Sequence, residues 1–147
     1  MTRPLILVVL AMLAFLGTAD SFYLAESAVM DTTLVCTIDG LSDCNVVAQS
    51  HYEQLFNIHL GVYGVAFYVA LFALILLIRF RPYRLIYQAL LGWSGIGVVA
   101  SLVFLGIQFF LIQALCVYCI GSAVITFITF PLSYVLYKRF APHGSVQ

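Results

Sequence analysis

The sequence predicts an all-α integral membrane protein, a bundle of four helices with both termini on the cytoplasmic side. Of its 147 residues, 64% are hydrophobic and 8% are charged, whereas soluble domains average about 45–50% apolar and about 25% charged residues. Only helices and closed barrels satisfy every backbone group within a bilayer, and the alternating pattern of a barrel is absent. The length suits one membrane domain over residues 1–147.

Long apolar stretches define the four helices. From Leu85 to Tyr137 the chain carries no charged residue. As one helix this stretch would extend about 80 Å at ~1.5 Å per residue, against a hydrocarbon core of about 30 Å. It must therefore turn back once, and we place the turn near residues 110–115. The four spans are then predicted over residues 5–25, 60–78, 86–110 and 116–137.

The charges are sorted along the chain although the net charge is zero. Short cytoplasmic loops collect Lys and Arg, so the termini and the connection after the second span are predicted to be cytoplasmic. The outer loop, residues 26–59, then faces the other side. No basic patch exists beyond these anchors, so nucleic acid is not expected as a partner. The basic residues are Arg3, Arg79, Arg81, Arg84, Lys138 and Arg139, and the acidic ones are Asp20, Glu26, Asp31, Asp39, Asp43 and Glu53.

The N-terminal stretch has a second interpretation. Arg3 followed by an apolar core and by small residues up to Ala19 resembles a secretory signal that is cleaved after Ala19. Cleavage would leave three spans and keep the cysteines on the same side. We favour an uncleaved first helix, because apolar and aromatic residues continue through Ala25.

Two further patterns concern packing and the outer loop. Small residues in the second and third spans are predicted to allow close helix packing. Residues 45–56 are predicted either as a short amphipathic helix on the bilayer surface or as a surface loop. The small residues are Gly61, Gly64, Gly92, Gly95, Gly97 and Ala100.

Four cysteines form two pairs at the non-cytoplasmic end. Cys36 and Cys44 lie in the outer loop with seven residues between them, and Cys116 and Cys119 form a Cys-x-x-Cys motif where the last span begins. This motif is usually redox-active. The helix dipole favours a thiolate at Cys116, which makes it the attacking group in exchange. Cys119 lies one turn deeper, where a lipid-soluble electron acceptor can meet it.

Three other interpretations of the cysteines are weaker. A disulfide within one helical turn would constrain little. A four-thiolate zinc site has the right ligand count but would place one pair at the bilayer edge, so no metal is expected. Unreactive buried cysteines would not explain the pairing. The alternatives to a redox enzyme are therefore a non-catalytic membrane interaction protein with structural disulfides, and a metal-handling membrane protein.

The order and spacing of several motifs resemble one known family, the vitamin K epoxide reductase family, in particular its prokaryotic homologues that generate disulfides. The resemblance covers nearly the whole chain. The DsbB type of disulfide generator carries its Cys-x-x-Cys in the first outer loop instead. The motifs are Cys36-x7-Cys44, Ser50-x-Tyr52 followed by Phe56, Gly64-x-x-Phe67-Tyr68 and Cys116-Val-Tyr-Cys119.

The resemblance implies a quinone-dependent thiol–disulfide oxidoreductase. A reduced thioredoxin-fold (DsbA-like) partner would attack the loop disulfide at Cys36. Cys44 would pass the electrons to Cys116 through a mixed disulfide, and Cys119 would reduce a quinone of the ubiquinone or menaquinone type. Many bacterial relatives carry a fused thioredoxin-like domain, whereas this sequence stops at Gln147. The partner is therefore expected to be a separate protein.

The resemblance is less complete at the quinone. Vertebrate members hold it with an asparagine and a tyrosine, and the matching positions here read Leu60 and Ala123. We expect Asn57 or His59 to donate a hydrogen bond instead. Aromatic residues are expected to line the ring site, although His59 and these aromatics also fit an interfacial belt. The aromatic candidates are Phe56, Tyr63, Phe109 and Tyr118.

Overall fold

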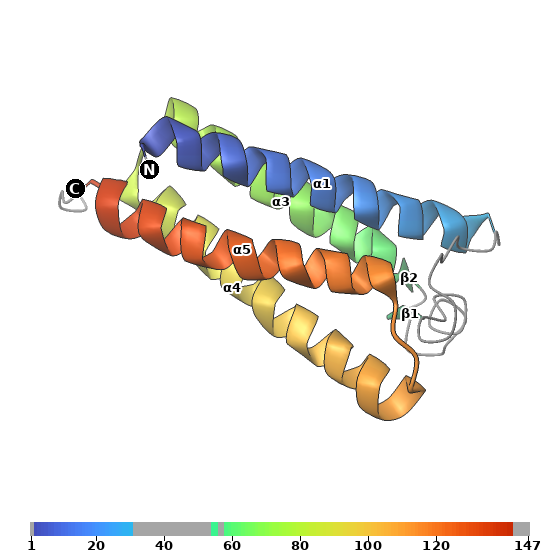
Figure 1. Ribbon diagram of the computed structural model, residues 1–147. Helices are drawn as coiled ribbons and strands as arrows, with labels where there is room; N and C mark the ends of the chain where they lie inside the picture. Colours follow the sequence, from blue (N-terminus) through green and yellow to red (C-terminus); the bar gives the residue numbers. More distant parts are fainter. Residues whose placement is uncertain (1, 31–53, 56–57, 143–147) are drawn as a thin grey trace.

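The computed structural model describes residues 2–30, 54–55 and 58–142, and its helices form a four-helix bundle (Figure 1). Within this described part, four helices are long and apolar enough to cross a membrane, which confirms the predicted fold class. The helices run past the predicted spans because polar residues at their ends do not interrupt the backbone hydrogen bonds. They are α1 (Arg3–Val29), α3 (Leu60–Phe80), α4 (Arg84–Ile107) and α5 (Val117–Phe140), with a π-helical segment, η2 (Gln108–Ile112), continuing α4.

A tight reversal connects α3 to α4. The last hydrogen bond of α3 runs from the Arg81 N–H to the Leu77 carbonyl at 2.7 Å. Pro82 follows, and it cannot continue the helix because it lacks an N–H and restricts the residue before it. Arg79 lies in the last turn, where its charge complements the helix dipole.

The reversal between α4 and α5 overlaps the predicted range of 110–115. The chain stays π-helical to Ile112, and Gln113 then adopts a left-handed conformation with φ 56°. Glycine is the usual residue for this conformation, and the sequence has none here, which is why the turn has no clear signal. Helix α5 begins at Val117.

The two ends of the bundle differ in what they carry. Both termini and the α3–α4 connection lie at one end, whereas α5 begins at the other end, beside the short strands (Figure 1). Strands β1 (Gln54–Leu55) and β2 (Ile58–His59) pair antiparallel, with Gln54 opposite His59. Residues 54–55 are thus extended, so the prediction of a helix over residues 45–56 is wrong at these two positions. The rest of that segment lies outside the described residues.

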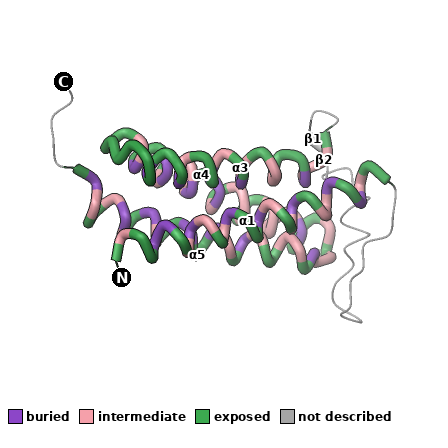
Figure 2. Tube along the Cα trace, turned by 90° about the horizontal axis from the view of Figure 1, so that it is seen from above, coloured by how far each residue is buried: buried purple, intermediate pink, exposed green. Residues whose placement is uncertain are grey.

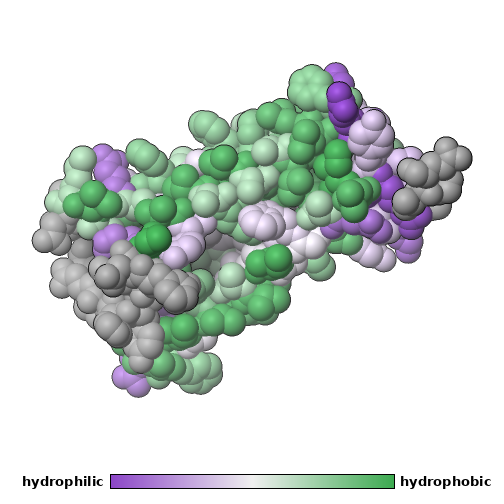
Figure 3. Space-filling view, turned by 180° about the vertical axis from the view of Figure 1, so that it is seen from behind, coloured by the Kyte–Doolittle hydropathy of each residue, from purple (hydrophilic) through white to green (hydrophobic). Residues whose placement is uncertain are grey.

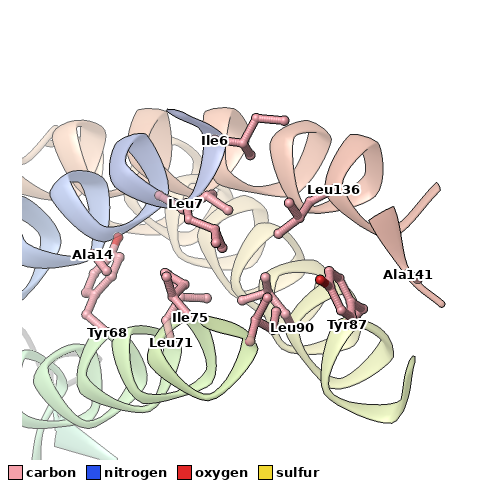
Figure 4. Packing of buried hydrophobic residues seen from close by; sticks show 12 residues of the cluster. Ile6, Leu7, Ala14, Tyr68, Leu71, Ile75, Tyr87, Leu90, Leu136 and Ala141 are labelled. Atoms are coloured by element: carbon pink, nitrogen blue, oxygen red, sulfur yellow. The ribbon is translucent and has the colours of Figure 1, made fainter. Parts of the chain in front are cut away.

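The apolar core occupies the half of the bundle near the termini. Buried residues follow the inner faces of the helices, and exposed ones face outward (Figure 2). Figure 4 shows the core side chains from all four helices converging. Its largest fully buried members are Tyr68, Tyr87, Ile6, Leu10, Leu71, Ile78, Leu90 and Leu136.

The outer surface is apolar. Hydrophobic residues cover much of the middle of the face seen in Figure 3, and hydrophilic residues gather towards its ends. Large side chains such as Phe15 and Leu102 are 66% and 56% exposed. In water this surface would be strongly unfavourable, and it is the surface expected of a lipid-facing bundle.

Close packing is confirmed at several of the predicted small residues. A Cβ on Gly61 would lie 2.6 Å from the backbone nitrogen of Ala25, and a Cβ on Gly64 would lie 2.5 Å from the Ser21 Oγ. Gly61 lets α3 approach the backbone of α1, and Gly64 leaves room for the Ser21 side chain. The prediction of close packing is wrong at Gly92, where a Cβ would meet nothing within 4 Å. This position is exposed and points away from the other helices.

Candidate functional site

Cys116 and Cys119 lie at the start of α5, at the end of the bundle opposite the termini. Cys116 is the residue that precedes the first turn of α5, and its carbonyl accepts the Ile120 N–H at 3.0 Å. Cys119 lies one turn into the helix. Both are free thiols; Cys116 is 1% exposed and Cys119 is half-buried. Tyr23 and Leu24 of α1 pack against Cys116, so the pair is enclosed by neighbouring helices.

The two thiols interact directly. The Cys119 S–H donates a hydrogen bond to the Cys116 sulfur, and this bond lowers the pKa of Cys116 to about 7. Burial opposes the shift, while the backbone N–H groups of Cys119 and Tyr118 support it. Cys116 is thus partly a thiolate at neutral pH and is the better nucleophile of the pair. The helix N-terminus contributes as the sequence predicted, but the Cys119 thiol contributes more.

Gln108, in η2, also holds the pair in place. Its side chain is 3% exposed, and its Oε1 accepts the Cys116 backbone N–H at 3.0 Å. The same side chain hydrogen-bonds the Cys119 thiol. The sequence analysis did not single out Gln108, although an amide in an otherwise uncharged apolar stretch was an available signal, since polar groups in membrane spans are costly unless they bind something.

A cavity of about 510 Å³ opens beside the cysteines. All four helices contribute to its wall, and both Cys116 and Cys119 belong to it. The volume lies within the range of about 300–1,000 Å³ that is usual for small-molecule sites, and the wall is mostly apolar. Its apolar lining includes Leu24, Tyr63, Phe67, Trp93, Ile96 and Phe104.

A few polar side chains interrupt the apolar wall. The Tyr68 hydroxyl lies 2.7 Å from the Ser122 Oγ and donates to the Ser122 carbonyl at 3.1 Å. Ser122 is three residues after Cys119, so both face the same side of α5. Farther along the wall, Ser101 and Thr126 share a hydrogen bond of 3.0 Å. Tyr68 and Ser122 were not among the candidates proposed from the sequence for binding a ligand.

The structure separates the predicted quinone-site residues. Tyr63 lines the cavity, and so does Leu60. His59 precedes the first turn of α3, and the Tyr118 ring lies 5.2 Å from the Tyr23 ring; neither His59 nor Tyr118 belongs to the cavity wall. Phe109 is 64% exposed and also lies outside the wall.

The remaining candidates, Cys36, Cys44, Phe56 and Asn57, lie outside the residues that the structure describes. Their arrangement around the Cys116–Cys119 pair stays a prediction. Among residues 2–30 and 58–142, no three His, Cys, Asp or Glu side chains group closely enough to hold a metal ion. A site that includes the loop cysteines is not tested by this finding.

Comparison with known proteins adds one result to this geometry. Residues 8–134 match the family described as the vitamin K epoxide reductase family. No curated protein matches the chain. The family match covers most of the chain and includes all four cysteines. Membership implies a quinone-linked thiol–disulfide oxidoreductase role, and on this match the chain belongs to the vitamin K epoxide reductase family.

Proposed function

We propose that the protein is a membrane thiol oxidase that takes electrons from a reduced thioredoxin-fold protein and passes them through two cysteine pairs to a membrane quinone, supporting disulfide formation outside the cytoplasm. The observation that carries the proposal is the position of Cys116 and Cys119. They form a hydrogen-bonded pair in the wall of a largely apolar cavity. A structural disulfide would not need such a cavity, whereas an electron-transfer pair does.

The cavity wall fits a quinone ring. The ring is flat and apolar with two carbonyl oxygens, and the wall is apolar with hydroxyl groups on Tyr68 and Ser122 one turn from Cys119. A bound quinone supplies an acceptor for two electrons and two protons. The ring faces would contact aromatic side chains such as Tyr63 and Phe67, which belong to the same wall.

The thiols supply both electrons. When Cys116 and Cys119 join in a disulfide, the pair loses two electrons and two protons. In the reverse half of the cycle, we propose that Cys36 accepts electrons from the partner and that Cys44 passes them to Cys116. Cys116 suits this exchange, because its lowered pKa makes it reactive near neutral pH.

The proposed orientation places the cysteines at the non-cytoplasmic face of the cell membrane. The basic anchors support it, since Arg3, Arg79 and Arg84 lie in helix ends opposite the start of α5 (Figure 1). Lys138 and Arg139 occupy the last turn of α5 at that same end. Positive charge gathers on the cytoplasmic side of membrane proteins, so the thioredoxin-fold partner is expected outside the cytoplasm.

The direct test uses the purified, fully reduced protein in detergent. Short-chain ubiquinone and menaquinone analogues are added separately, quinone reduction is followed by absorbance, and each cysteine is assigned by peptide mass spectrometry. We expect one disulfide for each quinone reduced, first between Cys116 and Cys119 and then, as electrons pass from the loop pair, between Cys36 and Cys44. If neither quinone changes the redox state of this pair, the proposal is wrong and the structural-disulfide alternative is favoured.

Two matched variants test the cavity itself. Ala100 lines the cavity, whereas the neighbouring Val99 is 61% exposed on the outside of α4. Ala100→Phe places a ring in the cavity and is expected to raise the KM for the quinone. Val99→Phe adds similar bulk on the lipid side and is expected to leave it unchanged. Equal effects of the two changes would contradict a quinone site here.

A further inference from the structure

We propose that a small cavity between the start of α4 and the end of α5 binds the phosphate group of an anionic membrane phospholipid, with Arg84 and Lys138 as its ligands. The cavity has a volume of about 110 Å³ and is lined by Arg84, Tyr137, Lys138, Ala141 and Pro142. It lies at the end of the bundle that carries the termini, opposite the cysteines (Figure 1). This site is therefore separate from the proposed redox function.

The cavity lies at the depth of the lipid headgroups. Helix α5 has 24 residues and extends about 36 Å at ~1.5 Å per residue, whereas the hydrocarbon core is about 30 Å thick. Its charged last turn, which contains Lys138, therefore reaches the headgroup region. Helix α4 begins with Arg84 at the same end of the bundle (Figure 1). Both cations are thus placed where lipid phosphates lie.

Side chains from two helices converge on the cavity. The Arg84 Nη2 donates a hydrogen bond to the Tyr137 hydroxyl at 3.4 Å, which turns the guanidinium of α4 towards α5. A guanidinium has five N–H donors, so this bond leaves others for an anion. Lys138 follows Tyr137 on α5, and its Nζ lies 5.9 Å from the centre of the Tyr134 ring. A phosphate in the cavity would receive donors from both helices.

No carboxylate among the described residues neutralises these two cations. Within residues 2–30, 54–55 and 58–142 the acidic residues are Asp20 and Glu26, and both belong to the far half of α1. Asp20 is about 25 Å along the helix from Arg3, at ~1.5 Å per residue. Two cations that share a cavity without a nearby carboxylate favour an anionic ligand.

The helix ends add a smaller electrostatic effect. The first turn of α4 contains no acidic residue, and no side chain caps it, so its free N–H groups also favour an anion. The end of α5 carries the opposite partial charge of roughly 0.5 elementary charge, which Lys138 and Arg139 outweigh. A zwitterionic headgroup would bring an ammonium group towards the same cations. The cavity is therefore expected to select a headgroup with a net negative charge.

The cavity includes only some of the basic residues at this end. Arg79, Arg81 and Arg139 do not line it. Arg139 follows Lys138 in the chain and is also exposed, but it lies about 100° farther around the helix. Arg139 thus carries the same charge at nearly the same height without facing the cavity, and it provides a matched control for Lys138.

The experiment uses the full chain, freed of lipid in a neutral maltoside detergent at physiological salt. Dioleoyl-phosphatidylglycerol, which is anionic, and dioleoyl-phosphatidylcholine, which is zwitterionic, are titrated separately, and native mass spectrometry measures the bound lipid. We expect saturable binding of phosphatidylglycerol and binding of phosphatidylcholine that is weaker by about fivefold or more. Inorganic phosphate, which has the same chemistry without acyl chains, should not displace phosphatidylglycerol at equal concentration.

Three variants test the two ligands. Arg84→Gln and Lys138→Gln should each weaken phosphatidylglycerol binding by about fivefold, which corresponds to the ~1 kcal/mol that a basic residue contributes near an anionic headgroup. Arg139→Gln removes the same charge and should weaken binding by less than about twofold, because charges beside the site are screened over about 8 Å at this salt concentration. Thermal unfolding without lipid checks that each variant is folded.

Three results would overturn the proposal. One is equal binding of the two lipids. Another is an equal loss of binding in Lys138→Gln and Arg139→Gln, because the cations would then act only as general surface charge. The third is displacement of phosphatidylglycerol by inorganic phosphate at equal concentration, which would assign the cavity to a soluble anion. A protein that binds the lipid as expected but never reduces a quinone would instead overturn the proposed function and leave this site standing.

Discussion

Replacing Cys119 with alanine should raise the pKa of Cys116 and slow its reactions at neutral pH. The hydrogen bond from Cys119 is the largest cause of the lowered pKa, which falls from the ordinary 9.0 to about 7. Without it, burial and the Asp20 charge oppose the two backbone N–H groups, so the pKa should rise towards the ordinary 9.0, and a full return to that value sets the upper limit of the effect. At pH 7 the thiolate fraction then falls from about one half to about 1%.

The reaction rate falls less than the thiolate fraction. A more basic thiolate is a stronger nucleophile, and a Brønsted coefficient of about 0.4–0.5 recovers about six- to tenfold over this range. Cys119→Ala should therefore react about five- to eightfold more slowly at pH 7. At about pH 10, where about 90% of the thiolate is formed in the variant too, the same variant should react about six- to ninefold faster. The two pH profiles must cross.

The assay measures exchange between the reduced protein and a small neutral disulfide from pH 5.5 to pH 10, with peptide mass spectrometry to count only Cys116. Cys119→Ser is the matched control, because its hydroxyl keeps a donor near the Cys116 sulfur and should hold the midpoint close to 7. A Cys119→Ala profile still centred near pH 7 would refute the reasoning, since the low pKa would then arise from the helix N-terminus alone.

Two further predictions concern charge and packing. The Asp20 carboxylate raises the pKa of Cys116, so Asp20→Asn should move the midpoint of the same exchange profile to lower pH. Glu26→Gln, at an exposed position on the same helix, should leave the midpoint unchanged. A rise in the midpoint for Asp20→Asn would contradict this prediction. Gly61→Ala should lower the free energy of unfolding by about 1–3 kcal/mol, because the new Cβ would lie 2.6 Å from the backbone of α1. Gly92→Ala should instead raise the free energy of unfolding by about 0.5–1 kcal/mol, because its Cβ meets nothing within 4 Å and alanine favours the helix. Equal losses in thermal unfolding of the two variants would count against the packing described here.

The sequence predicts the fold well because the lipid leaves few alternatives. A stretch without charges that is too long for one crossing must turn back, and basic residues at both of its ends require the same topology. The turn itself was located only approximately, because Gln113 adopts a left-handed conformation without a glycine. The place of Cys116 and Cys119 at the start of the last helix was also predictable, since it follows from the motif and from the apolar stretch after it.

The surroundings of the cysteines were harder to predict, because they depend on how the helices rotate and approach. Gln108 reaches the start of α5 only through the π-helical segment and the reversal after it. The predicted Phe109 is its neighbour in the chain, yet it faces outward and is 64% exposed. One residue along a helix is a rotation of about 100°, and a hydropathy pattern that is apolar on all sides does not fix that rotation.

The small residues also show what the sequence alone does not determine. The sequence predicts a small-residue face on α3 and α4, and such a face either closes on a neighbouring helix or leaves a space. At Gly61 and Gly64 it does both: these glycines meet α1 closely, and they also line the cavity. Across the cavity, Phe67 of α3 stacks on Trp93 of α4 at 5.7 Å between ring centroids, and the Trp93 N–H donates to the Phe67 carbonyl at 3.1 Å. The same Phe67 ring occupies the space beside Gly97 of α4, where an added Cβ would lie 2.4 Å from it. Small residues therefore either pack closely on a neighbouring helix or leave a cavity, and the outcome depends on which large residues lie opposite them across the interface. This arrangement is a property of the folded pair of helices, and neither sequence segment determines it alone.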